Sequence, residues 1–589
     1  MFNYRFKYKL TWLRVLLVTV LVLGIFFRLV NLDRKVYWYD EGFTSLRVGG
    51  YTIPEVAQSF NGQVIGVADF RNQYLSPNSG RGFFGTIKSL AVEDPQHPPL
   101  YYLITHLWMQ WFGNSVAAIR SLPALISLLV FPCAYWLCLE LFNSQLVGWI
   151  SVALIAVSPF HVLFAHEARE YSLWTVTILL SSAALLQAIR LKTVYSWAIY
   201  ALTLIVALYT FLFSAFVAIA HFIYVIGTEG RLSKTVIAYL KATFVAFIAF
   251  LPWIEVVIHN YARLRDSTSW MTEAKIPLLQ LARLWANSIK ILFFDFNKFE
   301  RLLLIFILIL VGYSVYFLCR YTDKKIWLFL VSLFGITALA LILPDLISGG
   351  QRSMMGRFLI PCYLSIQLAV AYLIARKISF KSVQELRSGD ELKQFNEPQR
   401  RRKASCVGGF PMPHRSNSST PAREWLDLSK GAWNRGKEGG FIFVSWQGFW
   451  LFVMLVIFTG GVISDVILSE SEVPWTKLKN YHDYKIARTI NQASSPLVIV
   501  SNYQSRDDNN VSYLFSFSHL LDAKVKLQLV KGKELPNIPN GYSDVFLYNP
   551  CAQEGIEKEF QVLLSELDKR QYKAKPVEIS QPVLLWRLR

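Results

Sequence analysis

Charged residues are scarce in this chain. Only 17% of its 589 residues are Asp, Glu, Lys or Arg, against roughly 25% in an ordinary soluble domain. In their place, 53% of the residues are hydrophobic and 15% are aromatic. An ordinary soluble protein is excluded, because the hydrophobic residues gather in runs that approach the roughly 20 residues needed to span a bilayer.

Cysteine is also scarce, and none of the cysteines forms a C-x-x-C pair. Four of the six fall inside or beside apolar runs, so we interpret them as packing residues and not as a disulfide framework or a zinc site. A nucleic-acid-binding motif is missing as well. We therefore expect the net charge of +20 to mark a basic cytoplasmic face and not a nucleic-acid surface.

No small-residue cleavage site follows the first apolar run, VLLVTVLVLGIFF, although basic residues precede it as in a signal sequence. We expect an uncleaved first helix with its N-terminus in the cytoplasm. Eleven apolar segments in all predict a mainly α-helical, polytopic membrane protein. Their approximate ranges are 11–32, 116–138, 146–165, 171–190, 195–211, 212–226, 236–258, 301–319, 326–346, 357–376 and 441–465.

The basic residues of the connecting loops predict the topology. Eleven spans place all the basic loops in the cytoplasm, as the positive-inside bias requires. These loops hold Arg190 and Lys192, Arg231 and Lys234, Arg320, Lys324 and Lys325, and Arg376 and Lys377. The assignment works only if residues 99–112 do not cross the membrane. This segment is short and rich in Trp and Tyr, so we predict a re-entrant or interfacial helix.

The span map divides the chain into a transmembrane core and three further parts. Residues 1–376 form the core, with a large outside loop at 33–115, and residues 441–465 form the last helix. Residues 377–440 read as a basic, disordered cytoplasmic insertion. Residues 466–589 have a soluble composition, with strand-like runs PLVIVS, KVKLQLV, DVFLYN and PVLLWRL and a helix at 555–569. They predict a small extracytoplasmic α/β domain.

The segment Tyr37–Gly42 lies just beyond the first span. Its aromatic residues suit an interfacial belt, but the belt does not require the adjacent acids Asp40 and Glu41. Carboxylates at a membrane rim are costly when buried, which makes them functional candidates. The alternative is a pair of acids in a solvated loop.

A second polar motif, His97-Pro98-Pro99, precedes the predicted interfacial helix. The prolines fix the backbone and start the helix. His97 is then placed at the mouth of an outside cavity, where it could orient a phosphate or an acceptor. An ordinary histidine at a helix start explains the pattern equally well.

A third motif, His166–Tyr171, joins two spans on the same predicted side as Asp40. It contains Glu167, Arg169 and Glu170 between two apolar runs. A solvated connector is the alternative, but the shared side favours a common site with Asp40.

The fourth motif, Gly349–Pro361, also faces outward in this topology. Arg352 and Arg357 run against the positive-inside bias. A bound anion would explain them, because the guanidinium fork matches phosphate oxygens. Snorkelling of both side chains to lipid headgroups is the alternative.

Together these motifs resemble the GT-C superfamily of membrane glycosyltransferases. The acidic pair after the first span, the HPPLYY segment, the outside EARxY turn and the late R-F-L-x-P start are similar to the protein O-mannosyltransferase-like family, which includes the lipid A aminoarabinose transferases. The resemblance covers roughly residues 10–375 and is strongest over 37–190. It implies that residues 1–376 form the catalytic core and that the donor is a polyprenyl-phosphate-linked sugar.

The resemblance also assigns roles to individual residues. It implies that Asp40 is the catalytic base with Glu41 beside it. The remaining matched residues would bind substrate, namely His97, Glu167, Arg169, Glu170, Tyr171 and Arg357. Arg352, from the fourth motif, is a further candidate for the lipid phosphate.

The chemistry expected of such a site is a direct displacement. A carboxylate removes the proton of the acceptor, and the lipid phosphate leaves as an anion that needs cationic donors and no general acid. The anomeric configuration is then inverted. No cluster of His, Asp and Glu has metal-ligand spacing, so we commit to no metal, although a divalent cation beside Glu41 remains open.

Two other classes stay open at this stage. A transporter or flippase of lipid-linked saccharides would also be polytopic, but internal repeats and paired broken helices of the kind found in many transporters are not evident. The second is a non-catalytic assembly protein. The sugar, the acceptor (lipid, protein or glycan) and the oligomeric state are not specified. We expect a multi-pass protein of the plasma or inner membrane with its active site outside.

Overall fold

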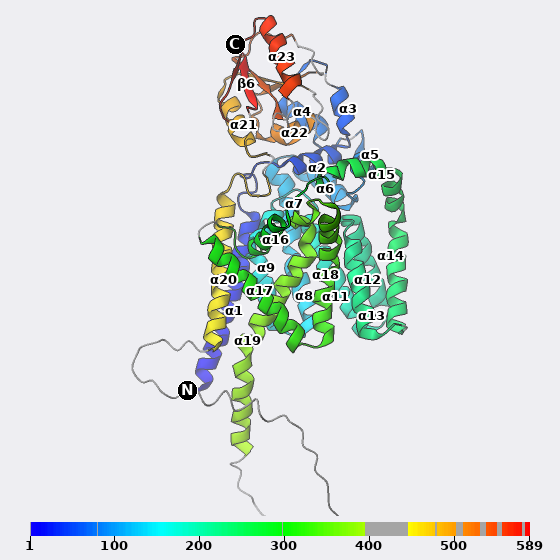
Figure 1. The fold of residues 1–589 in the computed structure, drawn as a ribbon, viewed down its shortest axis with the longest axis vertical. Coiled ribbons are helices and arrows are strands. Elements are labelled where there is room, and N and C mark those ends of the chain that lie inside the picture. The colour runs from blue at the N-terminus through cyan, green and yellow to red at the C-terminus, as the bar shows by residue number, and fades with distance from the viewer. Residues whose placement is uncertain are drawn as a thin grey trace, which may run out of the picture. The chain divides into compact units, whose positions relative to one another are not determined.

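The structure is a computed structural model in which helices dominate (Figure 1). Contacts divide the chain into one unit made of Met1–Ala375 with Leu455–Arg589, and a second unit at Arg376–Met454. The residues that the structure describes are 2–59, 61–78, 80–231, 233–296, 299–394, 446–477, 480–501, 510–530, 537–550, 557–579 and 583–588.

Eight helical segments among the described residues are long and apolar enough to cross a membrane. They are α1 (Phe2–Leu29, apolar from Trp12), the joined α7 (Val116–Leu128) and α8 (Val130–Phe142), α11 (Tyr171–Leu191), α14 (Lys234–His259), α17 (Glu300–Tyr321), α18 (Lys324–Ser348), α19 (Ile360–Gln394, with the apolar stretch Gly356–Ser379) and α20 (Trp446–Glu470). Two helices, α9 (Gln145–Ala156) and α10 (Pro159–Ala165), form a further span bent by 62°.

The predicted division of residues 195–226 is present in the structure. Helix α12 (Val194–Thr210) ends where Phe211 adopts an extended backbone, and α13 (Ser214–Glu229) begins three residues later. The Ala207 carbonyl accepts both the backbone N–H of Phe211 (3.0 Å) and the hydroxyl of Ser214 (2.7 Å), so the two helices are hydrogen-bonded across the break. These two helices are shorter than the other spans, so the count of eleven stays a prediction.

The first loop is built mainly from short helices: α2 (Tyr39–Gly49), α3 (Ile53–Gln58), α4 (Val67–Tyr74), α5 (Gly82–Glu93) and α6 (Leu100–Phe112). Helix α6 covers the segment predicted to lie at the interface. Its 13 residues extend only about 20 Å at 1.5 Å per residue, less than the roughly 30 Å of a hydrocarbon core. Its end exposes Trp111 and Phe112, as suits a membrane surface.

The C-terminal part contains a six-stranded mixed sheet with the order β1-β3-β2-β4-β6-β5. The strands are β1 (Val64–Gly66), β2 (Pro496–Ser501), β3 (Lys526–Val530), β4 (Asp544–Tyr548), β5 (Ala574–Pro576) and β6 (Leu585–Leu588). Strands β3, β2 and β4 are parallel neighbours, and β1 and β6 pair antiparallel on either side of them. All four predicted strand runs and the predicted helix, α23 (Glu557–Lys569), are present.

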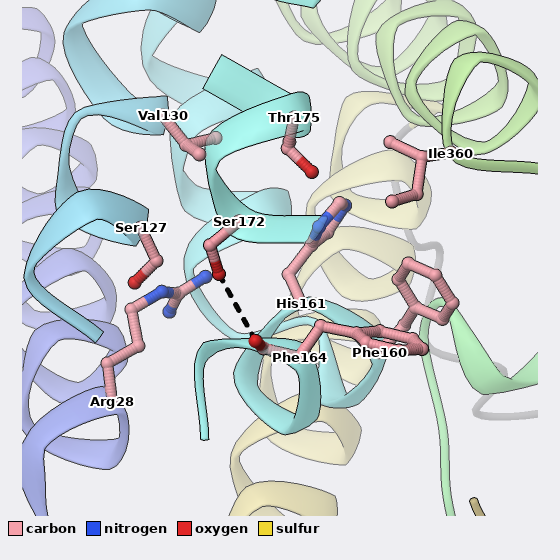
Figure 2. Close-up of a pocket in the computed structure, with 9 residues that line it drawn as sticks. All are labelled: Arg28, Ser127, Val130, Phe160, His161, Phe164, Ser172, Thr175 and Ile360. Carbon is pink, nitrogen blue, oxygen red and sulfur yellow. Dashed lines mark hydrogen bonds between the residues drawn. The ribbon is translucent and has the colours of Figure 1, made fainter. Parts of the chain in front are cut away.

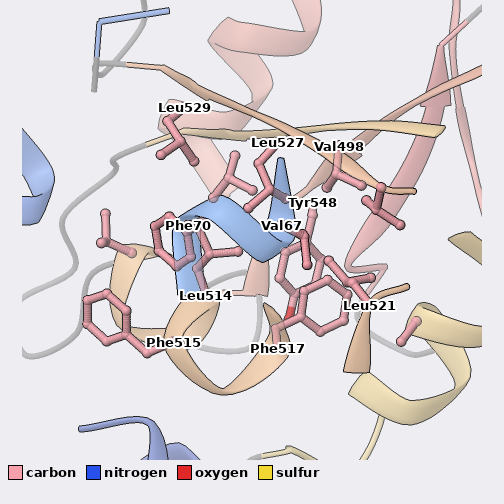
Figure 3. Packing of buried hydrophobic residues seen from close by; sticks show 14 of the residues in the cluster. Val67, Phe70, Val498, Leu514, Phe515, Phe517, Leu521, Leu527, Leu529 and Tyr548 are labelled. Atoms are coloured by element: carbon pink, nitrogen blue, oxygen red, sulfur yellow. The ribbon is translucent and has the colours of Figure 1, made fainter. Parts of the chain in front are cut away.

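The boundary predicted for this domain needs correction, because the first loop completes its sheet and core. Strand β1 belongs to the first loop, and α4 after it inserts Val67 and Phe70 among Leu514, Phe517 and Leu527 (Figure 3). Three residues of β1 carry too little hydrophobic pattern to reveal this pairing from sequence. At its start, the predicted domain loses residues 466–470, which complete α20.

The predicted cytoplasmic insertion at 377–440 lies mostly outside the described residues. Its first part continues α19 as helix to Gln394, and the structure describes nothing further until Trp446. The described cysteines, Cys133, Cys138, Cys319 and Cys362, are free thiols. Cys406 and Cys551 lie outside the described residues.

Candidate functional site

The two acids of the first motif occupy the first turn of α2 and point in different directions. Successive residues of an α-helix are rotated by about 100°, so Asp40 and Glu41 cannot share an environment. The Asp40 side chain is 26% exposed, whereas that of Glu41 is fully buried. Glu41 reaches back to accept the backbone N–H of Trp38 (2.8 Å), which fixes the start of the helix.

Every oxygen of Glu41 is saturated with hydrogen bonds. Oε1 accepts from Arg120 Nε (2.8 Å) and from the backbone N–H of Ala168 (2.8 Å). Oε2 accepts from Arg120 (2.7 Å), Lys477 (2.9 Å) and Trp38. A carboxylate offers about four lone-pair sites, so none remains to bind a metal ion or to accept a proton from a substrate. This geometry suits an anchor better than the catalytic partner that the resemblance implied.

The charge of Glu41 is stable in this environment. Burial alone would raise the pKa of its carboxyl, but the charges of Arg120 and Lys477 hold that pKa well below its usual range. The ion pair with Arg120 also joins the first loop to α7, and the bond from Ala168 joins it to the third motif.

Asp40 faces Arg357 across a loose contact. The closest atoms, Asp40 Oδ2 and Arg357 Nη2, are 3.8 Å apart, which is longer than a hydrogen bond. The Arg357 guanidinium also lies 5.3 Å from the ring centroid of Trp38, and its Nε has no hydrogen-bond partner among the described residues. Arg357 therefore keeps donors that are free to bind an anion, and Asp40 keeps acceptor positions that are free to take a proton.

Arg169 ties the first three motifs together. Its Nη1 donates to the Asp40 carbonyl and to the Thr44 hydroxyl (both 3.3 Å), and its Nη2 donates to His97 Nε2 (3.2 Å). Because arginine has only donors, Nε2 of His97 must accept. Nδ1 of the same ring lies 2.9 Å from Glu170 Oε1.

Glu170 is the buried acid of the third motif. Burial alone would raise the pKa of Glu170, but the charge of Arg169 is the chief cause that lowers it to about 2. Tyr102, at the start of α6, adds a long hydrogen bond to its Oε2 (3.4 Å). Tyr171 begins α11 directly after it, with its ring 5.9 Å from the Arg169 guanidinium. Glu170 thus orients His97 and Arg169.

Glu167 differs from Glu170 in having an uncommitted oxygen. Its Oε1 accepts from the Thr476 hydroxyl (2.9 Å), whereas its buried Oε2 has no partner among the described residues. Burial raises the pKa of Glu167 to about 7, against the opposing charge of Lys477. A carboxyl of this kind changes its protonation state near neutral pH.

Arg352 does not join this group. It pairs with Asp345 at the end of α18 (2.8 Å) and also donates to the Gly349 carbonyl. The same carboxylate accepts from the backbone and the hydroxyl of Ser353. Within the described parts of the chain, the hydrogen bonds and the ion pair of Arg352 go to Asp345 and Gly349 and not to Asp40, His97 or Arg169. The structure thus brings together every predicted site residue except Arg352.

Sequence reasoning missed three long-range partners of the site: Arg120, Lys477 and Asn480. Arg120 carried a usable signal, because a charge near the start of an apolar span is a functional candidate. Lys477 and Asn480 follow the last span in a polar segment with no distinguishing pattern. No group of three or more possible metal ligands occurs among the residues in the described ranges.

A small pocket lies among the span helices (Figure 2). Arg28, Ser127, His161 and Ser172 give its lining polar character, and Ile360 closes it three residues after Arg357. Arg28 donates to the Ile155 carbonyl (2.9 Å) at the break between α9 and α10. The cavity is centred among the spans and not on Asp40, and its polar lining stabilises the broken helix.

One family model matches part of the chain. Residues 96–255 match the family model described as dolichyl-phosphate-mannose-protein mannosyltransferase. The matched segment contains His97 and the third motif, from His166 to Tyr171. No curated protein matches the chain significantly.

Solved structures are similar to this chain at low sequence identity. The crystal structure of ArnT from Cupriavidus metallidurans bound to undecaprenyl phosphate is 12% identical, with 98% of each chain covered and a TM-score of 0.53. Its apo state gives 13% identity, 98% coverage of each chain and a TM-score of 0.49. The oligosaccharyltransferase AglB from Archaeoglobus fulgidus gives 11%, 86% of this chain, 64% of that chain and 0.43. The first likeness shows that the chain has the ArnT fold.

Proposed function

On the premise that this chain is a membrane glycosyltransferase of the GT-C superfamily, which the matched segment and the ArnT fold support, we propose that it transfers a hexosyl or pentosyl group from a polyprenyl-phosphate donor. Asp40 is the catalytic base and Arg357 binds the phosphate of the donor. The acceptor is a lipid, a protein or a glycan that carries a free hydroxyl or amine.

The loose contact between Asp40 and Arg357 carries this proposal. Two opposite charges, both partly exposed, stand 3.8 Å apart without a hydrogen bond, although each has free hydrogen-bonding capacity. The fully buried pair of Glu41 with Arg120, by contrast, closes to a hydrogen bond of 2.7 Å. A phosphate oxygen that binds Arg357 would satisfy the guanidinium and release Asp40 to act as a base.

The reaction is a single displacement at the anomeric carbon. The acceptor oxygen or nitrogen forms a bond to this carbon while Asp40 takes its proton, and the bond from the carbon to the phosphate oxygen breaks. Both electrons of the broken bond stay with the lipid phosphate, which leaves as an anion and needs no general acid. Arg357 stabilises the growing negative charge, and the configuration inverts.

The buried groups around the pair would hold its geometry. Arg169 fixes the backbone of Asp40 through its carbonyl and places His97 beside it. His97, which lies against Arg169 and Glu170, would orient the donor sugar or the acceptor. Such positioning is where a displacement reaction gains much of its rate.

The extracytoplasmic side is the better location for the site. Helix α11 begins at Tyr171, within the cluster, and ends beside Arg190 and Lys192. Helix α18 runs the opposite way, from Lys324 and Lys325 toward the segment that holds Arg357. The basic ends of these helices therefore lie away from the cluster, and basic ends favour the cytoplasm.

Purified protein in nanodiscs tests the proposal when it is given a synthetic polyprenyl-phosphate sugar and candidate acceptors. We expect free polyprenyl phosphate to accumulate together with an inverted glycoside. The Asp40→Asn variant, with unchanged thermal unfolding, should release little. Movement of intact donor across the bilayer without release would instead identify a flippase, and turnover of the variant at the wild-type rate would remove Asp40 from the role of base.

A further inference from the structure

The start of helix α2 is held by a segment that arrives from the far end of the sequence. Residues 475–477 and 480–483 follow the last span and lead into the C-terminal sheet. Lys477 from this segment reaches Glu41, Thr476 reaches Glu167, and Asn480 reaches the backbone of Tyr39. The segment therefore touches both acidic turns of the candidate site.

Asn480 occupies the position that matters most for Asp40. Its Oδ1 accepts the backbone N–H of Tyr39 at 2.9 Å, and Tyr39 is the first residue of α2. This N–H is one of the donors that a helix start leaves without an internal partner. Glu41 serves the N–H of Trp38, so one side chain from inside the helix and one from outside it secure the turn that carries Asp40.

The amide of Asn480 is itself fixed on its other side. Its Nδ2 donates to Asp483 Oδ2 (2.6 Å), and Tyr548 on strand β4 donates its hydroxyl to Asp483 Oδ1 (3.0 Å). Asn480 and Asp483 are almost fully buried. These hydrogen bonds form a continuous chain from Tyr548 on the sheet, through Asp483 and Asn480, to the backbone next to Asp40.

The body of helix α2 is held by packing that does not depend on the Asn480 hydrogen bond. Helix α2 rests on α22 (Asn510–Phe517), where a Cβ added at Gly42 would lie only 2.8 Å from the backbone nitrogen of Ser516. The ring of Tyr39 also lies 4.9 Å from that of Tyr513. Loss of the hydrogen bond would therefore free the first turn and not the body of the helix.

We infer that Asn480 is a positioning residue that holds the Asp40 turn in place by binding the backbone N–H of Tyr39. The inference rests on the proposed function of Asp40 and extends the candidate site to the C-terminal sheet. An unsatisfied buried N–H is costly, so the turn should fray when Asn480 cannot accept. A displacement of about 1 Å at a reacting group can lower a rate about 100-fold.

The Asn480→Ala variant tests the inference through two readouts. We expect kcat for donor turnover to fall about 10- to 100-fold while KM for the donor changes little, because Arg357 is untouched. We also expect amide hydrogen exchange to accelerate at residues 39–43. A purely structural role would move the melting temperature without this split between kcat and KM.

Exchanging the two partners offers a rescue. In the double variant Asn480→Asp with Asp483→Asn, the carboxylate at position 480 can still accept from Tyr39, and the amide at 483 can donate to it and accept from Tyr548. The single variant Asn480→Asp breaks this chain of hydrogen bonds, because it sets two carboxylates against each other. The double variant should regain protection at 39–43 and most of kcat.

Asn491→Ala is the matched control. Asn491, in α21 (Asp483–Gln492), makes two hydrogen bonds of 3.0 Å, to the Leu520 carbonyl and from the Asp522 amide, and neither of them reaches α2. We expect it to lower stability without changing exchange at 39–43 or kcat. Unchanged exchange and kcat in Asn480→Ala, or no recovery of either in the double variant, would overturn the inference. If the wild-type protein transfers no sugar, the proposed function fails, while exchange at 39–43 still decides whether Asn480 holds the turn.

Discussion

The two acidic turns of the site, at Asp40–Glu41 and at Glu167–Glu170, share one arrangement. Each turn has one carboxylate that is buried and ion-paired: Glu41 with Arg120, and Glu170 with Arg169. Each also has one carboxylate with free acceptor capacity: Asp40, which meets Arg357 only at 3.8 Å, and Glu167, whose Oε2 has no partner in the described residues.

Within each turn, one acid has a structural role and the other is available for catalysis or ligand binding. A buried charge is tolerated only when it is paired, so the paired acids have their lone pairs committed to holding loops together. The other acid is free to exchange protons or to meet a ligand. In each of these two turns, therefore, one acid is a structural ion-pair partner and the other is the functional candidate. The hydrogen-bond partners of each acid distinguish the two roles.

The largest expected effect is the loss of activity when Asp40 is replaced. The Asp40→Asn variant removes a proton acceptor that holds no close hydrogen bond, so we expect kcat to fall by about 10²- to 10⁴-fold with little change in unfolding temperature. Steady-state release of polyprenyl phosphate measures the first effect and thermal unfolding in detergent measures the second. Retained turnover would mean that the exposed acid of the turn is not the base.

Glu41→Gln should show the opposite pattern. Removal of its charge leaves Arg120 and Lys477 buried beside a neutral amide, which should destabilise the protein by about 3–5 kcal/mol. Glu55→Gln is the matched control. Glu55 likewise accepts a backbone N–H at the start of its helix, that of Thr52, but its ion pair is with the half-buried Arg81. A loss of stability no greater than that of the control would contradict the anchor role.

A smaller effect is expected from Arg357, and Arg352 serves as its comparison. Arg357→Gln should lower kcat/KM for the donor by about 10²- to 10³-fold, because it removes a donor for the developing phosphate charge. Arg352→Gln breaks a pair with Asp345 and should leave the affinity for inorganic or lipid phosphate nearly unchanged. Equal losses of phosphate affinity in both variants would place the phosphate between the two arginines and not at Arg357 alone.

The smallest effect concerns Glu167 and its dependence on pH. Burial raises the pKa of Glu167 from 4.5 to about 7, so the folded protein binds a proton in this range that the unfolded chain has lost. The contribution of Glu167 to stability is thus present below pH 4.5 and declines as the pH rises to 7. Unfolding of Glu167→Gln, followed from pH 5 to 8, should lack this decline. The same decline in the variant would assign it to another group.

The span helices and the strands of the C-terminal sheet followed from local pattern. Continuous hydrophobicity defines the spans, and runs such as PLVIVS define strands. The break at Phe211 was also predictable, because the stretch is too long for one helix. The site motifs were recognisable because polar residues interrupt apolar runs, and the structure brings Asp40, His97, Arg169 and Arg357 together.

The remainder depends on contacts between residues hundreds of positions apart. Strand β1 is three residues long and gains its identity only from β3. Asn480 binds Tyr39 across 441 positions, with no local signal at either end. The difference in burial and pairing between Asp40 and Glu41 also cannot be predicted from local sequence. The ion-pair partners of Glu41, which are Arg120 and Lys477, come from distant parts of the chain.

A structure of the protein with a non-hydrolysable polyprenyl-phosphonate sugar would test the central claim most directly. The account predicts that the phosphonate binds the Arg357 guanidinium and that the anomeric carbon lies on the open side of Asp40, with Glu41 still paired to Arg120. A phosphonate bound elsewhere, with Asp40 and Arg357 still facing each other, would contradict it.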